Sequence, residues 1–430
     1  MSEKKKVLII TYYWPPSGGS GVQRWLKFVK YFSPFGIEPI IFTPADPHFN
    51  LKDSSLLADV PADTEILQFP IWEPYRILER LQSIFGRRKS AASANLSEPK
   101  GLAAFIRANF FIPDPRVFWG RPSVRFLKSF LQEREIDTIV TTGPPHSVHL
   151  IGLGLKNQLP NIKWLADFRD PWTTWGFLLG MRPGKIAMAL HKNLEKRVLH
   201  AADAVSTVSP FYSRQIEALS GKSVSVVTNG FDPVDFVKLK PQRTSKFIIR
   251  HVGMLHPACD PVPFLKAFST WVTERNLQDK VELRFTGQVH AGLYKILERD
   301  SILRSTIVIE SPVSHTQLIR LYQETSAVLL ILSGYKDAEG FLPGKLFEYL
   351  ATGLPVLAVG PIEGDAAKVL EETEAGKMID SSDLLGIRNM LAKNYEEWLN
   401  GLTATATPVK TMMYSRIRLA EKMAEILKKL

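Results

Sequence analysis

The sequence has very little cysteine and no long hydrophobic run. Cys259 is the single cysteine among 430 residues, which excludes a disulfide framework within the chain and a metal cluster built on several thiolates. The longest apolar runs, 327–332 and 354–360, are far shorter than the roughly 18 residues that a membrane-spanning helix needs. No signal-peptide core precedes the first polar residues. We therefore expect a cytoplasmic protein without a transmembrane segment.

The composition is that of a globular chain with an excess of positive charge. Hydrophobic residues make up 45% and charged residues 23%, which excludes wholesale disorder and fibrous repeats. A chain of 430 residues has room for two or three domains. The net charge of +11 favours anionic partners, namely nucleic acid, phosphorylated small molecules or anionic lipid. Much of the excess falls in residues 76–134, which hold twelve basic and four acidic side chains.

Strand and helix patterns alternate along both halves of the chain, which favours α/β domains with doubly wound parallel sheets. The first half has strand patterns at 7–11, 39–43, 138–142, 163–167, 204–208 and 223–228. The second half has them at 247–252, 281–285, 306–309, 327–332 and 355–359.

Three other segments help to define the domain organisation. Residues 231–246 contain two prolines and no clear period, so they are the best candidate for the boundary between the halves. Residues 78–108 have weak periodicity and are interpreted as an insertion rather than core. Residues 415–430 predict an amphipathic helix whose apolar side must cover a groove.

A glycine-rich loop follows the first predicted strand. Gly18, Gly19 and Gly21 would let backbone amides and a helix N-terminus approach a phosphate or a sugar closely. A turn without a ligand is the alternative interpretation. A dinucleotide site is disfavoured because Arg24 stands where the third glycine of that motif would be, and no ribose-binding acid ends the second strand.

The strongest local motif lies at 341–357. Pro343 suits the start of a helix and Gly353 its C-cap, so a short helix is predicted between a loop and a buried strand. Its first amides and the Lys345 side chain would together receive a diphosphate, and Glu348, one turn later, could accept from ribose hydroxyls. The alternative is a surface ion pair between Lys345 and Glu348. The amides expected to be free are those of Gly344, Lys345 and Leu346.

Polar side chains follow two further predicted strands. Arg169 and Asp170 come directly after 163–167, and His146 follows 138–142. Open α/β sheets bind ligands at the carboxyl ends of their strands, so these groups are candidates for a site. A loop ion pair and a capping histidine are the alternative interpretations. Residues 227–232 are equally consistent with a simple Asx turn.

These motifs occur in the order seen in glycosyltransferase family 4, which the chain resembles over most of its length. The resemblance implies a GT-B fold, with two Rossmann-like domains facing across a cleft and a C-terminal helix packing back on the first. The domains would be 1–235 plus 408–430, for the acceptor, and 244–407, for the nucleotide sugar. The motifs are Gly18-Gly-x-Gly21, Asp167-Phe-Arg-Asp-Pro-Trp172, Val208-Ser209, Thr228-Asn-Gly-Phe-Asp232 and Gly344-Lys-Leu-Phe-Glu-Tyr-Leu-Ala-x-Gly-x-Pro355.

The resemblance also implies an activity and a set of site residues. The activity is retaining transfer of a sugar from a UDP or GDP sugar to a hydroxyl of a glycan or lipid-linked acceptor in cell-envelope polysaccharide synthesis, without a cofactor or an essential metal. The predicted catalytic groups are Asp170, Arg169 and His146. The predicted donor-binding residues are Gly253, Glu339, Gly344, Lys345, Leu346 and Glu348. The loop near the donor phosphate and the acceptor is that of Gly18, Gly19 and Gly21.

The chain departs from the family pattern at three places. Gly340 stands eight positions before Glu348, where the family often has a glutamate, and Glu339 precedes it by one. Met254 and Cys259 stand where an arginine and a lysine are usual, so His256 or Lys345 would compensate. Residues 168–170 stand where many members have a histidine.

The basic stretch 76–134 suggests docking on an anionic membrane, because aromatic side chains lie near its charges. A solvated basic face with core aromatics is the alternative. Nucleic-acid binding is a second function class, disfavoured because no recognised module holds the basic residues. A sugar-nucleotide epimerase of the same fold is a third. The aromatic residues near the charges are Trp72, Phe85, Phe105, Phe110, Phe111, Phe118 and Trp119.

Overall fold

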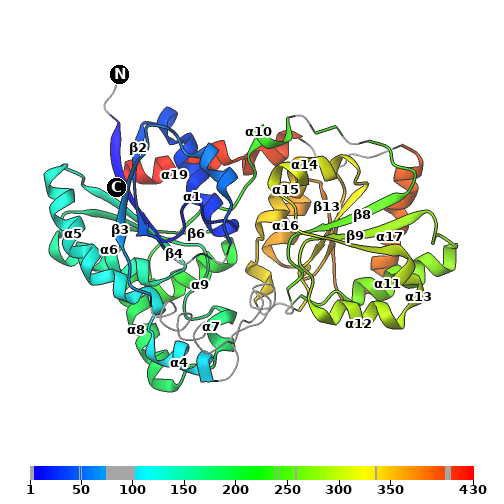
Figure 1. Cartoon of the computed structure of the whole chain (residues 1–430), viewed down its shortest axis with the longest axis horizontal. Coiled ribbons are helices and arrows are strands. Elements are labelled where there is room, and N and C mark those ends of the chain that lie inside the picture. The colour runs from blue at the N-terminus through cyan, green and yellow to red at the C-terminus, as the bar shows by residue number, and fades with distance from the viewer. Residues whose placement is uncertain are drawn as a thin grey trace. The chain divides into compact units, whose positions relative to one another are not determined.

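The computed structural model describes residues 4–47, 49, 51–73, 102–237, 239–240, 242–256, 259–334, 337–401 and 408–430. The chain forms two compact units (Figure 1). Unit 1 comprises Met1–Thr228 and Arg416–Leu430, and unit 2 comprises Asn229–Ser415. None of the described helices combines the length and the apolar composition needed to cross a bilayer.

Unit 1 is built on a seven-stranded parallel sheet in the order β3-β2-β1-β4-β5-β6-β7. The order is doubly wound, because the chain adds strands on one side of β1 and then, from β4 onward, on the other. Side chains on both faces of β1 are buried, which explains its unbroken apolar run. The strands are β1 (Lys5–Thr11), β2 (Ile37–Ala45), β3 (Glu65–Pro70), β4 (Thr138–Gly143), β5 (Lys163–Phe168), β6 (Ala204–Thr207) and β7 (Ser225–Val226).

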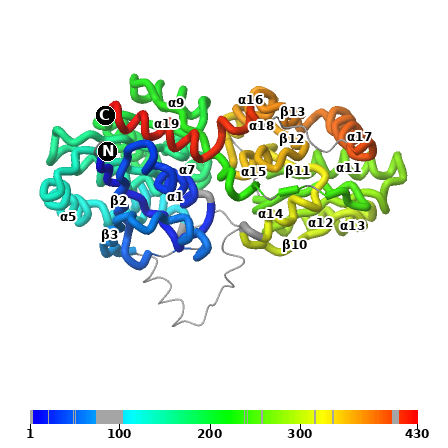
Figure 2. Tube along the Cα trace, turned by 90° about the horizontal axis from the view of Figure 1, so that it is seen from above, coloured from blue at the N-terminus to red at the C-terminus, as the bar shows by residue number. Residues whose placement is uncertain are grey.

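Helices cover this sheet, and the C-terminal helix α19 packs against α1, the first helix of the same unit (Figure 2). Leu419, Ala420, Met423 and Leu427 are buried in that contact, which confirms the predicted return of the last helix to the first domain. The helices of unit 1 are α1 (Ser20–Phe32), η1 (Ser33–Phe35), η2 (Ser54–Asp59), α4 (Leu102–Phe110), η3 (Pro115–Trp119), α5 (Gly120–Glu133), α6 (Ser147–Gln158), α7 (Gly176–Gly180), α8 (Lys185–Ala201), α9 (Pro210–Ser220) and α19 (Arg416–Lys429).

Unit 2 repeats the architecture with a six-stranded parallel sheet in the order β10-β9-β8-β11-β12-β13. The strands are β8 (Phe247–Val252), β9 (Val281–Thr286), β10 (Ile307–Glu310), β11 (Ala327–Ile331), β12 (Val356–Val359) and β13 (Gly376–Ile379). The helices are α10 (Pro233–Phe236), α11 (Val262–Arg275), α12 (Ala291–Arg299), α13 (Ser301–Thr306), α14 (His315–Gln323), η4 (Ala338–Gly340), α15 (Gly344–Thr352), α16 (Asp365–Glu372), α17 (Leu384–Leu399), α18 (Pro408–Thr411) and η5 (Met412–Tyr414).

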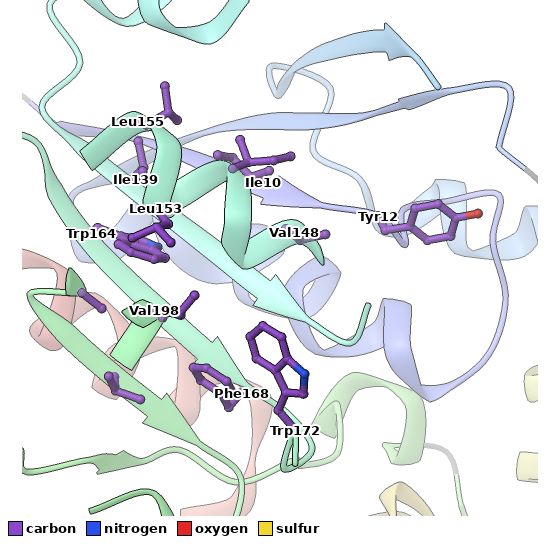
Figure 3. Close-up of a cluster of buried hydrophobic side chains, with 14 of the residues drawn as sticks. Ile10, Tyr12, Ile139, Val148, Leu153, Leu155, Trp164, Phe168, Trp172 and Val198 are labelled. Carbon is purple, nitrogen blue, oxygen red and sulfur yellow. The ribbon is translucent and has the colours of Figure 1, made fainter. Parts of the chain in front are cut away.

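The core of unit 1 reaches the segment that the sequence assigned to an insertion. Ala104 and Ala108 of α4 are buried in the same cluster as Trp164, Phe168 and Trp172, which Figure 3 labels. Small side chains four residues apart let the helix lie close to the core, so the prediction of an insertion was wrong for this helix. The preceding residues, 78–101, lie outside the described residues.

Two strands escaped sequence analysis, and both are edge strands. In β3 half-buried and exposed side chains alternate, and β13 has four residues with one buried side chain. An edge strand borders only one neighbour and lacks the continuous apolar run of a central parallel strand. The apolar pattern therefore predicts the centre of each sheet better than its margins.

Candidate functional site

Each sheet reverses its winding direction between two neighbouring strands. The reversal lies between β1 and β4 in unit 1 and between β8 and β11 in unit 2. Open α/β sheets bind ligands beyond the carboxyl ends of strands at such a point. The glycine-rich loop follows β1, His146 follows β4 and Gly253 follows β8. Each unit therefore has one candidate binding region at its winding reversal.

In unit 1 the glycine-rich loop lies tightly against a neighbouring segment. The Gly18 amide donates to the Leu51 carbonyl at 2.9 Å, and a Cβ at Gly18 would stand 2.9 Å from the Leu51 side chain. Gly19 has a φ of 90° and immediately precedes α1, whose N-terminus has no side-chain cap. The 13-residue helix α1 thus begins with backbone amides that no side chain occupies, as an anion-binding terminus requires.

Arg169 ties this loop to the end of β4. Its Nε donates to the Gly143 carbonyl at 3.1 Å, and its two terminal nitrogens donate to the carbonyls of Gly21 and Pro144. Burial lowers the pKa of Arg169, an effect that Asp170 and Asp167 oppose. No described carboxylate forms an ion pair with this guanidinium. Its charge is therefore held by carbonyl dipoles beneath the loop, and its direct contact with a diphosphate stays a prediction.

His146 and Asp170 lie at the same end of unit 1. The His146 ring is buried and stacks on Trp172, with ring centroids 5.0 Å apart and an interplanar angle of 3°. Neither ring nitrogen makes a hydrogen bond of good geometry among the described residues, although the Pro171 carbonyl interacts weakly with the ring. Burial lowers the pKa of His146 well below its usual value, so the ring is neutral. Asp170 is half-buried, and burial raises its pKa while Arg169 opposes the rise.

Arg24 and Asp167 form a buried ion pair that the sequence did not predict. Arg24 occupies the place of the third glycine of a dinucleotide motif, and its guanidinium lies 2.9 Å from the carboxylate. Asp167 also accepts from Trp25, Thr142 and Ser206. Burial disfavours its ionisation, but Arg24 and these hydrogen bonds hold its pKa below the usual value. The pair joins α1 to the centre of the sheet and leaves no open acceptor for a ligand.

In unit 2 the predicted helix at the strongest motif is present as α15. It follows Pro343 and ends at Gly353, whose φ of 71° is left-handed, as a glycine C-cap requires. The Leu346 amide donates to the Pro343 carbonyl at 3.0 Å, and the Leu346 side chain is buried in the core. The prediction of a free amide at Leu346 was therefore wrong, because a tight first turn uses it. The amides of Gly344 and Lys345 precede that bond.

The Lys345 side chain is held by a histidine that sequence analysis missed. Nζ of Lys345 lies 3.1 Å from Nε2 of His251, and Nδ1 of His251 lies 3.0 Å from the Leu329 carbonyl. A carbonyl only accepts, so Nδ1 carries the proton and Nε2 accepts from the ammonium group. Burial lowers the pKa of His251 well below its usual value and Lys345 adds to this, which agrees with a neutral ring.

Burial also acts on the ammonium group itself. It lowers the pKa of Lys345 to about 8, with Cys259 and Glu348 opposing the fall. No described carboxylate forms an ion pair with Lys345, so the alternative surface pair with Glu348 is not formed. The signal that could have revealed His251 is that it and Arg250 are the two polar residues in a strand pattern that is otherwise apolar.

The residues beside Lys345 supply space rather than charge. Gly253 has a φ of 86°, and a Cβ there would stand 3.7 Å from Nζ of Lys345. A Cβ at Gly287 would approach the Gly253 carbonyl oxygen to 2.4 Å, so this close contact requires glycine. Burial raises the pKa of the Cys259 thiol to about 12, which keeps it uncharged. Met254 is exposed and also carries no charge.

Glu348 and Glu339 differ in their surroundings. Glu348 is half-buried on α15, one turn after Lys345, as predicted. Glu339 is exposed in η4, and no hydrogen bond or ion pair joins its carboxylate to Lys345 among the described residues. The described residues also contain no group of three or more His, Cys, Asp or Glu side chains arranged to hold a metal ion.

The basic stretch divides between core and surface. Trp119 is buried and stacks on Phe42, which agrees with the alternative of core aromatics for this residue. Arg116 lies over the Tyr12 ring and 3.5 Å from Glu73. Residues 76–101, which include Phe85 and the basic cluster at 87–89, lie outside the described residues. Of the aromatic residues named for the membrane contact, Trp72, Phe105, Phe110 and Phe118 are exposed.

Comparison with known proteins identifies the fold. No protein-family model matches the chain, and no curated protein matches it significantly. Among solved structures it is similar to a glycosyltransferase from Rickettsia africae (13% identity, 99% of this chain and 98% of that one, TM-score 0.62). It is also similar to WaaG, a glycosyltransferase involved in lipopolysaccharide biosynthesis (13%, 98% and 99%, 0.58).

A putative UDP-N-acetylglucosamine 2-epimerase from Listeria monocytogenes is similar too (13%, 99% and 96%, TM-score 0.54). At 13% identity these similarities show the fold alone. They extend over nearly the whole of each chain, and both units have doubly wound parallel sheets. The chain has the two-domain, Rossmann-like GT-B fold.

Proposed function

We propose that the protein is a retaining glycosyltransferase that moves a sugar from a UDP or GDP sugar to a hydroxyl of a glycan or lipid-linked acceptor. Unit 2 binds the nucleotide sugar and unit 1 binds the acceptor. The proposal agrees with the GT-B fold and with the family 4 motifs in the sequence. A fold alone does not define a reaction, so the argument depends on the site.

The observation that carries the proposal is the position of Lys345. Its ammonium group lies beside Gly253 at the winding reversal of unit 2, held by a neutral histidine and not by a carboxylate. It belongs to the first turn of α15, where backbone amides and the positive end of the helix dipole favour an anion. A diphosphate carries the complementary charge, and Glu348 one turn later provides an acceptor for ribose hydroxyls.

The chemistry that we propose uses this positive charge on the leaving group. The bond between the sugar C1 and the diphosphate oxygen breaks, and the acceptor hydroxyl oxygen forms the new bond to C1 from the same face. The hydroxyl proton passes to the leaving diphosphate. Lys345 and the helix amides stabilise the charge that develops on that diphosphate. No side chain of the enzyme acts as nucleophile, and no metal ion is essential.

In unit 1 we propose that Gly18, Gly19 and Gly21 border the acceptor. Arg169 beneath them supplies positive potential and holds the loop in place. His146 is neutral, and Asp170 is the carboxylate next to Arg169. We propose that Asp170 and His146 contact the acceptor hydroxyl that reacts. An Asp170→Ala protein with full turnover contradicts that assignment.

An acceptor of the cell envelope is the finer part of the proposal. It is supported by the similarity to WaaG, which is involved in lipopolysaccharide biosynthesis. The net charge of +11 also favours an acceptor presented on anionic material. A sugar-nucleotide epimerase is the second candidate, favoured by the similarity to the Listeria protein. Product analysis separates the two, because an epimerase releases an altered sugar nucleotide and glycosylates nothing.

The first test is a thermal-shift titration of the full chain with UDP, GDP, ADP and CMP. A ligand at 100 times its dissociation constant stabilises the folded protein by about 2.7 kcal/mol, which such a titration detects. We expect one nucleoside diphosphate to raise the midpoint and to identify the donor base. Lys345→Met should lose the shift, whereas Lys393→Met, an exposed lysine of the same unit, should keep it. No shift with any nucleotide in the unaltered protein contradicts the proposal.

A further inference from the structure

Two helices of unit 1 together form a surface that is both basic and apolar. Helices α4 and α8 contact one another, and the α4 residue Asn109 accepts a hydrogen bond from the Gly184 amide at 2.7 Å, immediately before α8. Figure 1 shows α4, α7 and α8 gathered at one end of this unit. We call this surface the α4–α8 face and define it by residues 102–113 and 176–202.

Large apolar side chains of the α4–α8 face are exposed to solvent. Phe110 is 73% exposed and Ile186 is 81% exposed, far more than a side chain that supports a core. Both helices have an inner side that already packs on unit 1, through Ala108 on α4 and Ala187 and His191 on α8. The outward apolar side chains are therefore additional to those that the fold needs. They are Phe105, Ile106, Phe110, Ile186 and Leu190.

The charge of the α4–α8 face has one sign. It contains six arginine or lysine side chains and a single carboxylate, Glu195. Glu195 is buried and accepts from Thr173, and burial raises its pKa, so it adds little negative charge at the surface. The guanidinium of Arg107 lies 5.1 Å from the centre of the Phe177 ring. The cations are Arg107, Arg182, Lys185, Lys192, Lys196 and Arg197.

We propose that the α4–α8 face docks on an anionic phospholipid surface. Exposed phenylalanine and isoleucine side chains enter the boundary between headgroups and acyl chains, while the lysine and arginine side chains pair with lipid phosphates. The combination favours a membrane over nucleic acid, because phosphate contacts alone leave the five apolar side chains in water. The inference rests on the proposed function in one respect, that a lipid-linked acceptor gives this docking a purpose.

The α4–α8 face differs from the surface that composition predicted. Residues 76–134 were expected to carry the membrane contact, yet Arg116 and Trp119 of that stretch are engaged within unit 1. Most of the charge on the proposed surface comes from α8, more than fifty residues further along the chain. The two segments meet only because the fold brings α4 and α8 together.

The test is co-sedimentation of the full chain with phosphatidylcholine vesicles, with and without phosphatidylglycerol. We expect binding only when the anionic lipid is present, and weaker binding in high salt. Removing one lysine charge near an anionic surface weakens binding about fivefold, so Lys185→Gln, Lys192→Gln and Lys196→Gln combined should weaken it about a hundredfold. The matched control combines Lys266→Gln, Lys280→Gln and Lys377→Gln, three exposed lysines of unit 2, and should bind normally.

A second variant tests the apolar part. Phe110→Ser with Ile186→Ser should weaken vesicle binding at least about tenfold while leaving the thermal midpoint unchanged, because both side chains are exposed. Equal binding of all variants, or no binding of the unaltered protein, overturns the proposal. Tighter binding to a single-stranded oligonucleotide, lost in the lysine variant, would assign the face to nucleic acid instead.

These outcomes are separate from those of the proposed function. The lysine variant should keep its thermal shift with a nucleoside diphosphate, because its changes lie in unit 1 and the proposed donor site lies in unit 2. If the protein binds vesicles but no nucleotide, the membrane inference stands and the proposed glycosyltransferase function is contradicted. If it binds a nucleotide but no vesicle, the reverse holds.

Discussion

In each unit a positive side chain on a helix contacts a side chain of a central strand, but the two charges are compensated differently. In unit 1 the Arg24 guanidinium lies 2.9 Å from the Asp167 carboxylate, and both side chains are fully buried. Arg24 also donates to the carbonyls of Val227 and Thr228. In unit 2 Lys345 is half-buried, and its partner is the neutral ring of His251.

The difference separates a structural charge from one that is available to a ligand. A buried ion pair whose donors and acceptors are all hydrogen-bonded has no free group to offer a ligand. Removing one partner leaves the other charge buried and uncompensated. An ammonium group held by a neutral acceptor keeps its full charge, and burial has already removed part of its hydration. The proposed diphosphate would therefore gain more from Lys345 than it could gain from Arg24.

The largest effect, on the free energy of unfolding, should come from breaking the buried ion pair of Arg24 and Asp167. Asp167→Asn removes the counter-charge of Arg24 and should lower the free energy of unfolding by about 3 to 5 kcal/mol, measured by urea denaturation. Glu421→Gln, which breaks an exposed pair with Arg418 in the same unit, is the control and should change it by less than about 1 kcal/mol. If both variants lose the same small amount, the buried pair is not the structural element that we describe.

The next largest effect, on nucleotide affinity, should come from removing the ammonium charge of Lys345. Lys345→Met should weaken binding of the nucleoside diphosphate by about tenfold to 150-fold, because a hydrogen bond to a charged group contributes about 1.5 to 3 kcal/mol. Isothermal titration provides the affinity, and urea denaturation should show little loss of stability. Unchanged affinity in this variant would place the diphosphate elsewhere in the protein.

A pH titration should test the role of the Lys345 charge without any substitution. The pKa of Lys345 lies at about 8, so its ammonium form predominates below that pH and disappears above it. Affinity for the nucleoside diphosphate should therefore fall about tenfold between pH 7 and pH 9, since a rise of one unit above the pKa leaves about a tenth of the charge. Lys345→Met should remove the pH dependence, and a flat profile in the unaltered protein contradicts the role of Lys345.

Sequence analysis predicted the parts of each site that depend on local chemistry. The helix at Gly344–Thr352, its glycine cap and the strand before His146 follow from residues close together in the chain. The partners of Arg24 and Lys345 do not. Asp167 lies 143 residues from Arg24, and His251 lies 94 residues from Lys345. No periodicity connects such pairs, because the order of strands in the sheet brings them together.

The error at Leu346 has a different cause. A helix N-terminus leaves several amides without a helical partner, and the sequence does not say which of them a tight first turn will use. In α15 the Pro343 carbonyl accepts from Leu346. The α4–α8 face shows the same limit. Composition locates the positive charges along the chain, but it does not indicate which helices the fold places side by side.

The smallest effect should separate a positioning role of His251 from simple packing. His251→Leu removes the acceptor of the Lys345 ammonium group, and one hydrogen bond contributes about 0.5 to 1.5 kcal/mol, so nucleotide affinity should fall about twofold to tenfold. The midpoint of the pH profile should also move below 8, because a buried ammonium group without an acceptor loses its proton more readily. His251→Gln offers an amide oxygen in place of Nε2 and should recover part of both losses. If the leucine variant keeps the midpoint of the unaltered protein, His251 only fills the core, and Lys345 owes its position to α15 alone.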